Sequence, residues 1–326
     1  MLINGVFEGG GVKAIALAGA VKAAEERGIR FHQTAGTSSG AIVASFLAAG
    51  YNGDELKKLI METPFNEFVV QTWVHKLKPI GPAIRVFVKK GLYSGDRVEQ
   101  WVAEKLKDKG IRTFRDLPSK KLRIIASDIS QGKLMVLPDD LEDYGIDPLN
   151  FPIARAVRMS TSIPYFFEPV VLRKGPKARK KNESFADQFV YVVDGGLLSN
   201  FPLWIYDKDN AKIPEGKRLP TIGFQLVGKQ KMSNRKIIGP LTMLQALFAT
   251  MLEAHDERYI EKENRFRTVK IPTLGVRVTD FDIKPDKSEE LFQSGYKAAS
   301  AYFQNWSYEA YAQSFQEFIL AGKIKV

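Results

Sequence analysis

Residues 35–50 read AGTSSGAIVASFLAAG and place a serine between glycines, directly before a run of small residues. The segment GTSSG fits the pattern G-x-S-x-G with Ser38 at its centre, whereas Ser39 does not fit that position. Gly36 and Gly40 relieve crowding around a sharp turn, so the Ser38 hydroxyl can project from it. The pattern also occurs at ordinary strand-to-helix turns. The stretch therefore predicts a turn into a helix, and its functional interpretation is a nucleophilic serine.

A second glycine-rich loop precedes this turn. Residues 9–14, GGGVKA, follow an apolar strand predicted for residues 2–7 and open an alanine-rich helix. The loop fits G-x-G-x-x-A, but a dinucleotide site needs an acidic residue after the next strand, where AGTSSG stands instead. The spacing of a P-loop is absent as well. Two interpretations remain: glycines for close packing of the helix on a sheet, or backbone N–H groups that converge as an oxyanion hole.

The order of the elements predicts the fold class. Strand–helix–strand–helix at the start is typical of a parallel sheet with helices on its faces. We expect a three-layer α/β/α fold with a mainly parallel central sheet, in which residues 3–204 form the main domain and residues 205–326 pack on it with C-terminal helices. The later predicted strands are residues 121–129, 132–138, 167–172, 189–194 and 221–227. The later predicted helices are 54–62, 94–110, 152–163, 241–263 and most of 289–322. Residues 64–92 are expected to be irregular and to cap a pocket.

The chain has few candidates for a base that could activate Ser38. It holds three histidines, and His32 lies six residues before Ser38 on the same predicted strand, ~20 Å away at ~3.3 Å per residue. His75 and His255 have no recognisable catalytic context. Asp194, in YVVDGGLLSNFP, ends an apolar strand before two glycines. In open α/β sheets ligands bind at the carboxyl ends of strands, so Asp194 is a candidate base, although such an aspartate is also a common turn former.

Composition excludes several classes of site. The chain contains no cysteine, which rules out disulfides, thiolate nucleophiles and thiolate zinc sites. Its formal net charge of +11 favours anionic partners, but no nucleic-acid signature is present. The first residues lack a basic signal-peptide region, and no stretch approaches ~18 consecutive apolar residues. We expect a cytoplasmic protein.

Three motifs in this order, GGGVK, GTSSG and DGG, resemble those of the patatin-like phospholipase family. Residues 154–171, ARAVRMSTSIPYFFEPVV, also resemble the block that precedes the family's aspartate strand. The resemblance covers roughly residues 3–204. It implies a hydrolase of lipid acyl esters that uses a Ser-Asp dyad and needs neither histidine, nor metal, nor cofactor.

The resemblance also implies roles for individual residues. Ser38 is the nucleophile and Asp194 the general base, and the alcohol or lysolipid leaves before water releases the fatty acid. Backbone N–H groups of Gly9, Gly10 and Gly11 form the oxyanion hole. Ala14 departs from the family pattern, in which glycine is common. The supporting motif residues are Val12, Lys13, Ala14, Gly36, Gly40, Gly195 and Gly196.

A basic run suggests where a membrane could be involved. Residues 173–181, RKGPKARKK, carry six basic residues in nine between two predicted strands. They are either a solvated loop or a contact with anionic headgroups that could couple surface binding to the site. The apolar residues at 65–74 are either core or a lipid-contact lid. Two functional alternatives stay open: acyl transfer by the same dyad, and a non-catalytic lipid-surface protein.

Overall fold

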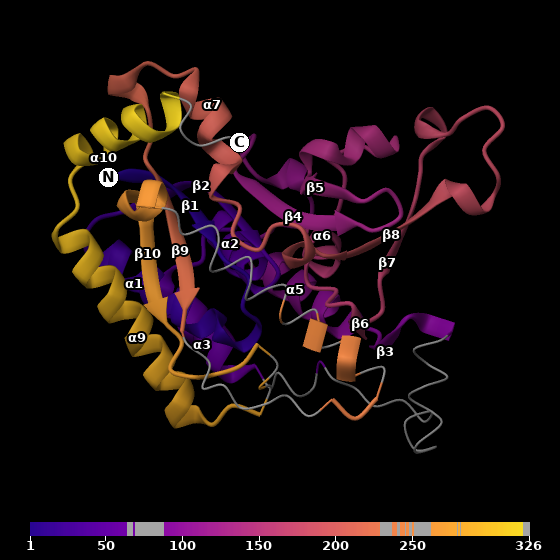
Figure 1. The fold of residues 1–326 in the computed structure, drawn as a ribbon, viewed down its shortest axis with the longest axis horizontal. Coiled ribbons are helices and arrows are strands. Elements are labelled where there is room, and N and C mark those ends of the chain that lie inside the picture. The colour runs from indigo at the N-terminus through magenta and orange to yellow at the C-terminus, as the bar shows by residue number, and fades with distance from the viewer. Residues whose placement is uncertain are drawn as a thin grey trace.

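The computed structural model describes residues 1–63, 68, 88–228, 237–239, 242–244, 246, 247, 250, 262–278, 280 and 282–321. A mixed α/β fold with a mainly parallel central sheet is confirmed (Figure 1). The main sheet of the described chain has the strand order β10-β9-β1-β2-β4-β8-β7, and β5 pairs with β4 outside this path. Its strands are β1 (Leu2–Phe7), β2 (Arg30–Thr37), β4 (Leu122–Asp128), β5 (Lys133–Leu137), β7 (Val170–Arg173), β8 (Phe189–Asp194), β9 (Thr221–Val227) and β10 (Thr268–Pro272).

Strand β4 brings two distant parts of the chain together. At Ile124 and Ile125 it pairs with parallel β2 and with antiparallel β5, so these two partners lie on opposite edges. From Ala126 to Asp128 it pairs with β5 and with antiparallel β8. Strands β2 and β8 therefore share one edge of β4, each along half of its length. They meet end to end, with Thr37 opposite Ile125 and Asp194 opposite Ala126.

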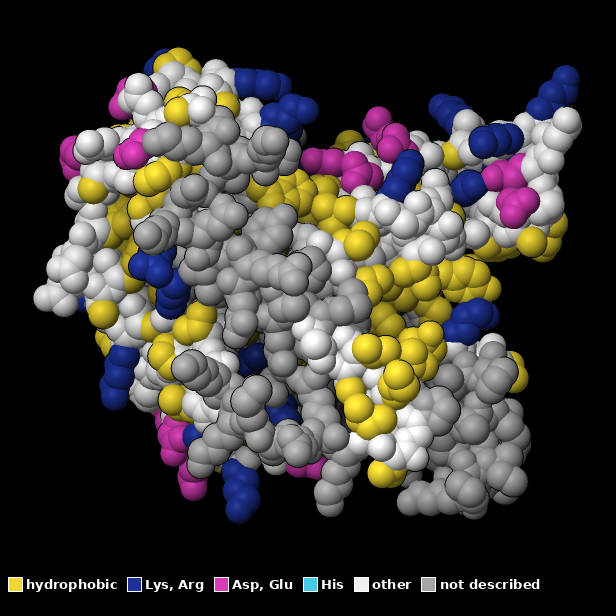
Figure 2. Space-filling view, viewed as in Figure 1, with side chains coloured by type: hydrophobic (Ala, Val, Ile, Leu, Met, Phe, Trp, Pro, Cys, Tyr) yellow, Lys and Arg dark blue, Asp and Glu magenta, His cyan; other side chains and the backbone are white. Residues whose placement is uncertain are grey.

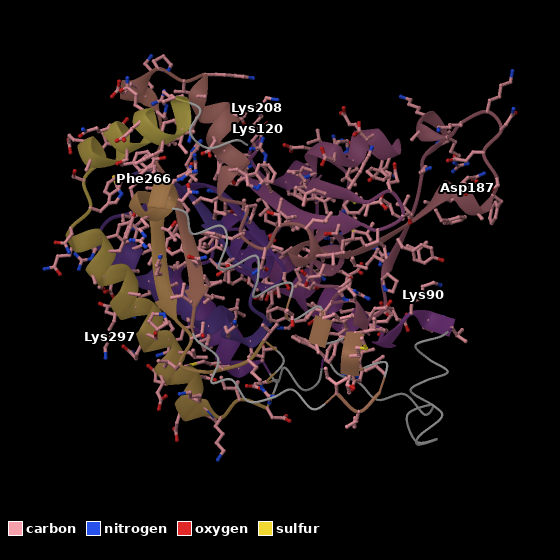
Figure 3. The ribbon with its side chains drawn as sticks, in the orientation of Figure 1. Lys90, Lys120, Asp187, Lys208, Phe266 and Lys297 are labelled. Carbon is pink, nitrogen blue, oxygen red and sulfur yellow. The ribbon has the colours of Figure 1, made fainter. Side chains whose placement is uncertain are left out.

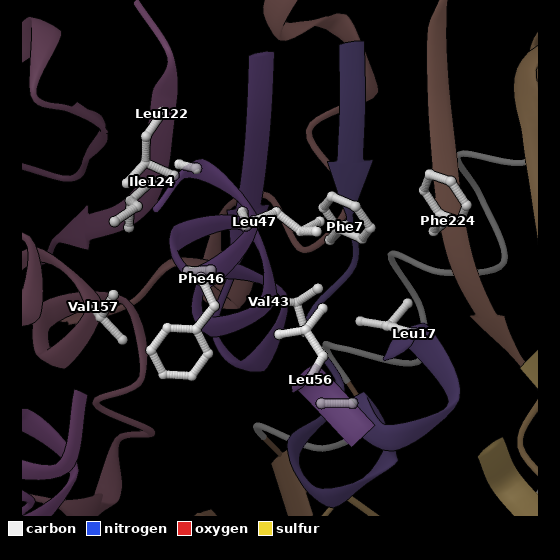
Figure 4. Close-up of a cluster of buried hydrophobic side chains, with 14 of the residues drawn as sticks. Phe7, Leu17, Val43, Phe46, Leu47, Leu56, Leu122, Ile124, Val157 and Phe224 are labelled. Atoms are coloured by element: carbon white, nitrogen blue, oxygen red, sulfur yellow. The ribbon is translucent and has the colours of Figure 1, made fainter. Parts of the chain in front are cut away.

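The helices cover the two faces of the sheet unequally. One face and its helices form the large core, part of which is shown in Figure 4. The helices that contribute to it are α1 (Ala14–Glu26), α2 (Ser39–Ala48), α3 (Gly53–Glu62), α5 (Asp96–Asp108), α6 (Ile153–Ser160), α9 (Pro285–Gln304) and α10 (Tyr308–Phe315). The other face carries a smaller core, in which Val6, Ala35 and Ile125 pack against the short 3-10 helix Leu203–Tyr206. Helix α7 (Asp207–Ala211) follows this 3-10 helix directly.

Residues 14–21 of helix α1 are apolar and buried on all sides because the helix lies between the sheet and helix α9. Two glycines allow the helices to touch. A Cβ on Gly19 would lie 2.0 Å from the carbonyl oxygen of Phe292, and one on Gly295 would lie 1.8 Å from that of Ala16. The alanine-rich sequence of α1 thus serves close packing with a helix almost 300 residues downstream.

Some predicted elements differ from the observed ones. The strand predicted for residues 167–172 is two strands: β6 (Tyr165–Phe167) pairs with β3 (Gly91–Tyr93) in a separate small sheet, and β7 joins the main sheet. The prediction had no strand at β10. The helix expected at 289–322 is interrupted after Gln304, and Ser307 caps α10. The predicted helix at 241–263 and the predicted cap at 64–92 lie largely outside the described residues.

Replacement of Gly295 by alanine should destabilise the protein. The new methyl group would overlap the Ala16 carbonyl oxygen and force the two helices apart, at a cost of about 1–3 kcal/mol in the free energy of unfolding. Gly216→Ala is the control, because its Cβ meets nothing within 4 Å and should change stability by at most about 0.5 kcal/mol. Urea unfolding measures both. Equal stabilities would contradict the close contact of α1 and α9.

Candidate active site

The backbone turns sharply at Ser38, between the end of β2 and the first residue of α2. Ser38 has φ 52° and ψ −126°, a conformation that is strained for a residue with a side chain. Glycines on both sides make the turn possible. A Cβ on Gly36 would lie 2.3 Å from the Gly40 carbonyl oxygen, and one on Gly40 would lie 2.2 Å from that of Phe7. The turn points the Ser38 side chain away from the path of both elements.

The Ser38 hydroxyl donates a hydrogen bond to Asp194. The distance from Oγ to Oδ2 is 2.7 Å, and the backbone N–H of Gly196 donates to the other carboxylate oxygen, Oδ1, at 2.8 Å. Both side chains are buried, with exposed fractions of 6% for Ser38 and 2% for Asp194. A Cβ on Gly195 would lie 2.3 Å from the Ile125 carbonyl oxygen, so glycine there lets the chain turn closely against β4.

Burial controls the protonation of Asp194. Removal of the carboxylate from water raises the pKa of Asp194 to about 7, and the hydrogen bonds from Ser38 and Gly196 oppose this rise. A carboxyl group with a pKa near neutrality can accept a proton and release it again at physiological pH. An exposed aspartate, with its pKa near 4, would be a much weaker base.

Ser160, at the end of α6, fixes the backbone of the turn. Its hydroxyl oxygen accepts a hydrogen bond from the Ser38 N–H at 2.8 Å and donates to the Ile125 carbonyl oxygen at 2.5 Å. Two residues later, the Ser162 carbonyl oxygen accepts the N–H of Asp194 at 2.9 Å. The last residue of α6 and the segment after it therefore hold the backbones of Ser38 and Asp194. Nothing in the sequence pattern identified Ser160, because its partners lie far away along the chain.

Arg158 fastens this segment to its surroundings. Its guanidinium group is buried, and it donates to the Ser162 hydroxyl and to the carbonyl oxygens of Ser94 and Glu168. Burial lowers the pKa of Arg158 to about 10, so the group remains charged at neutral pH. Arg158 thus joins the loops that contain Ser94 and Glu168 to the segment that positions Ser38 and Asp194.

The glycine loop lies against the turn, but its three N–H groups differ. The N–H of Gly9 donates to the Asn200 carbonyl oxygen at 3.2 Å, and the N–H of Gly10 donates to the Ser39 hydroxyl at 3.0 Å. The N–H of Gly11 has no hydrogen-bond partner within the described residues. Gly9 also contacts the turn closely, since a Cβ on it would lie 3.1 Å from that of Ser38. The loop is therefore next to Ser38, with one N–H open and one held by a side chain.

The remaining motif residues support the loop. Val12, Lys13 and Ala14 are all buried, and the Lys13 N–H donates to the Gly10 carbonyl oxygen at 3.2 Å. Of the three histidines, His32 lies in β2 with an exposed side chain, and His75 and His255 lie outside the described residues. Within the described residues no cluster of acidic or histidine side chains could hold a metal ion.

The rate at which Ser38 reacts with a fluorophosphonate should rise with pH, reach half of its maximum near pH 7 and level off above about pH 8. Only ionised Asp194 can accept the Ser38 proton, and its ionised fraction falls about tenfold per pH unit below the pKa. Labelling between pH 5 and 8.5 measures this. A rate that is flat between pH 5 and 7 would show that Asp194 is ionised throughout, or that it does not take the proton.

Ser160→Ala should slow this labelling at least tenfold, because the Ser38 N–H and the Ile125 carbonyl both lose a buried partner, at a cost of about 1–3 kcal/mol. Ser45→Ala is the matched control: Ser45 is equally buried in α2, but within the described residues its hydroxyl donates only to the Ala41 carbonyl oxygen of its own helix. Both variants are compared well below their melting temperatures. Equal labelling rates of the two variants would show that Ser160 does not position Ser38.

Comparison with known proteins agrees with the motifs. The profile of the family described as patatin-like phospholipase matches residues 5–206. The uncharacterized protein YqhO of Bacillus subtilis (strain 168) is 41% identical over 309 residues, which cover 94% of this chain and 100% of that protein. The uncharacterized protein R571 of Acanthamoeba polyphaga mimivirus is 26% identical over 212 residues, or 63% of this chain and 62% of the relative.

Two solved structures show a more distant likeness. VipD from Legionella pneumophila has a TM-score of 0.48 and 16% identity, with 95% of this chain and 67% of that chain covered. The ExoU–SpcU complex of Pseudomonas aeruginosa contains a chain with a TM-score of 0.47 and 15% identity, with 99% and 59% covered. The family profile spans well over half of the chain and includes Ser38 and Asp194, so this protein belongs to the patatin-like phospholipase family.

Proposed function

We propose that the protein is a lipid acyl hydrolase that cleaves carboxylic esters of phospholipids, lysophospholipids or related acyl lipids. The observation that carries this proposal is the 2.7 Å hydrogen bond from a strained serine to a buried aspartate whose pKa lies near neutrality. Family membership supports the lipid class of the substrate. The geometry supports the Ser-Asp dyad.

In the first step, Asp194 takes the hydroxyl proton as Ser38 Oγ attacks the ester carbonyl carbon. The short contact already directs the hydroxyl hydrogen toward the carboxylate, so no reorientation is needed before the proton moves. The carbonyl becomes a tetrahedral oxyanion. When it collapses, the C–O bond breaks, Asp194 returns the proton to the departing alcohol or lysolipid, and the acyl group stays on Ser38.

The developing oxyanion needs hydrogen-bond donors, and the glycine loop is beside Ser38. We assign this role to the N–H groups of Gly11 and Gly10. The Gly11 N–H has no partner within the described residues, and the Gly10 N–H is freed when the Ser39 side chain turns about a single bond. The N–H of Gly9 donates to the Asn200 carbonyl oxygen, so we do not assign it to the oxyanion. The role of Gly9 is to let the loop approach Ser38 closely.

Water completes the reaction. Asp194 accepts a proton from a water molecule as its oxygen attacks the acyl carbon. Collapse of the second tetrahedral species breaks the bond to Ser38 Oγ, and Ser38 regains a proton from Asp194 as the fatty acid is released. If an alcohol takes the place of water, the same residues transfer the acyl group instead.

The proposal includes where the enzyme works. None of the helices within the described residues is long and apolar enough to cross a bilayer. We propose a cytoplasmic protein that meets its lipid substrate by peripheral contact with an anionic membrane surface, with no nucleic-acid partner.

Stoichiometric fluorophosphonate labelling at Ser38, located by peptide mass spectrometry, tests the dyad. We expect labelling to vanish in Ser38→Ala. In Asp194→Asn, which keeps the size of the side chain but cannot take the proton, it should fall by about 10²–10⁴, the usual contribution of a general base. Ser45→Ala should label like the wild type. Release of fatty acid from phospholipid vesicles should follow the same order.

Two results would redirect the proposal. Absence of labelling in the folded wild type would make GTSSG a plain turn and favour a non-catalytic lipid-surface protein. Formation of a new ester after addition of glycerol or a lysolipid, in place of fatty acid, would identify acyl transfer.

A further inference from the structure

The connection between β7 and β8 is much longer than the strands require. These strands pair in antiparallel fashion at the edge of the sheet, with Val170 opposite Val192 and Arg173 opposite Phe189. Two residues can join such a pair, yet the chain uses residues 174–188, here called the arm. The arm projects from the body of the molecule beyond β7 and β8 (Figure 1).

The arm is braced internally. Lys174 and Glu183 form an ion pair at 2.5 Å with both side chains largely buried, and the guanidinium Nε of Arg179 donates to the Lys174 carbonyl oxygen at 2.7 Å. At its base the Gly175 N–H donates to the Tyr144 carbonyl oxygen at 2.7 Å. These contacts offset the conformational entropy that is lost when the arm is held in one conformation.

The outer face of the β7–β8 pair is aromatic and apolar. Alternate residues point to opposite faces, and Val170, Leu172, Val190 and Val192 fill the core. The outward positions are Val171, Arg173, Phe189 and Tyr191. An edge pair facing water would carry polar residues there. Val171 is 44% exposed, and Phe185 of the arm, 69% exposed, extends this face by contacting Phe189.

Cations surround this aromatic face. The Arg173 guanidinium lies against the rings of Phe185 and Phe189, at 5.7 and 5.6 Å from their centroids. Lys177, Lys180 and Lys181 are exposed on the arm, and they form no ion pair within the described residues. Lys90, which lies below the arm in Figure 3, covers the ring of Tyr191. Figure 2 shows blue side chains on the arm and hydrophobic side chains beneath it, on the same side of the molecule.

We propose that the arm and the outer face of β7–β8 dock the protein on an anionic lipid bilayer, with Phe185 inserted at the headgroup level and Lys177, Lys180 and Lys181 on the lipid phosphates. Aromatic rings beside exposed lysines suit the boundary between hydrocarbon and headgroups, where charge and apolar burial act together. Nucleic acid or an acidic protein would use the lysines but leave Phe185 without a role.

Docking through the arm would bring the Ser38–Asp194 site near a lipid substrate. This step of the inference rests on the proposed function. Strand β8 begins beside the arm at Phe189 and ends at Asp194, about 17 Å further at ~3.4 Å per residue. The arm is thus joined by one strand to Asp194, the proposed base of the dyad.

Not all six cations of residues 173–181 are available to bind lipid, because Lys174 forms an ion pair with the buried side chain of Glu183.

The test measures binding to vesicles by co-sedimentation, in a Ser38→Ala background so that the vesicles stay intact. Vesicles of phosphatidylcholine with phosphatidylglycerol are compared with pure phosphatidylcholine. Lys177→Gln/Lys180→Gln/Lys181→Gln should lower the partition coefficient on anionic vesicles about 10²-fold, and added salt should weaken wild-type binding in the same direction. Phe185→Ala should lower it about tenfold on the same vesicles, with little dependence on salt.

The matched control is Lys208→Gln/Lys212→Gln/Lys217→Gln, three exposed lysines in and after α7 that remove the same net charge far from the arm. Figure 3 shows Lys208 well away from Asp187 of the arm. The control should bind anionic vesicles within about twofold of the wild type, since exposed charges beyond a Debye length are screened. An equal loss in both triple variants would overturn the proposal, because net charge alone would then account for binding.

Other outcomes would also overturn it. These are unchanged vesicle binding in the arm variants, loss only of oligonucleotide binding in the lysine variant, and a dimer that Phe185→Ala separates. The result is independent of catalysis, because binding is measured without Ser38. If the hydrolase proposal also holds, the arm variants with Ser38 intact should lose activity on vesicles and keep it on a soluble short-chain ester. Arm-dependent binding without any hydrolysis would leave the docking surface in place and reject only the proposed function.

Discussion

The site depends on one constraint: β2 and β8 end against each other on the same edge of β4. Strand β2 runs parallel to β4 and delivers Ser38 just beyond Thr37, while β8 runs antiparallel and delivers Asp194 opposite Ala126. Because β4 fixes the register of both strands, residues 156 positions apart arrive within hydrogen-bond distance. A shift of either strand by two residues would move its side chain by about 7 Å and separate the pair.

The same arrangement supports the proposed chemistry of Ser38 and Asp194. Two strand ends that meet inside a sheet lie away from water, so the carboxylate of Asp194 loses hydration. Within the described residues its hydrogen-bond donors are Ser38 and Gly196. Burial raises the pKa of Asp194, and two hydrogen bonds to the carboxylate do not fully oppose this rise. Additional hydrogen-bond donors would stabilise the negative charge of Asp194 and make it a weaker base. The backbone strain at Ser38 costs free energy, which other contacts of the fold must offset. The hydrogen bonds of Ser160 and Arg158 hold the segment that keeps the turn in its strained conformation.

Sequence reasoning reached the motifs because each of them is local. Glycines that permit a close approach, a serine between them and an aspartate before two glycines are all visible within a few residues. The direction of β8 was not visible. Asp194 is expected at the end of an apolar strand, at the carboxyl edge of a mainly parallel sheet. Strand β8 is antiparallel to β4 and reaches this edge by starting beyond the end of β4. Its apolar run is compatible with either direction.

Other features could not be predicted because they depend on contacts between distant parts of the chain or on local hydrogen bonds that the pattern does not show. The helix predicted for residues 54–62 begins at Gly53 and is capped by Asn52, which forms a reciprocal pair with Glu55. The six basic residues before β8 looked equivalent in sequence, and only the fold shows that Lys174 is paired with Glu183. Ser160 and Asn200 touch the turn and the glycine loop through contacts that span more than 100 residues. Such pairs leave no trace in a single sequence.

The family profile ends at residue 206, yet the architecture of the site continues beyond it. Strand β1, which carries the chain into the glycine loop, pairs with β2 on one edge and with β9 on the other. The loop itself is closed by a later segment: the Val12 N–H donates to the Val278 carbonyl oxygen, and a Cβ on Gly11 would lie 2.0 Å from that oxygen. Helix α9 then covers α1. Without these residues, one edge of β1 would be open and the Val12 N–H, directly after Gly11, would lose its acceptor. The C-terminal third therefore shapes the oxyanion side of the proposed site, although the residues assigned to the chemistry all lie before it.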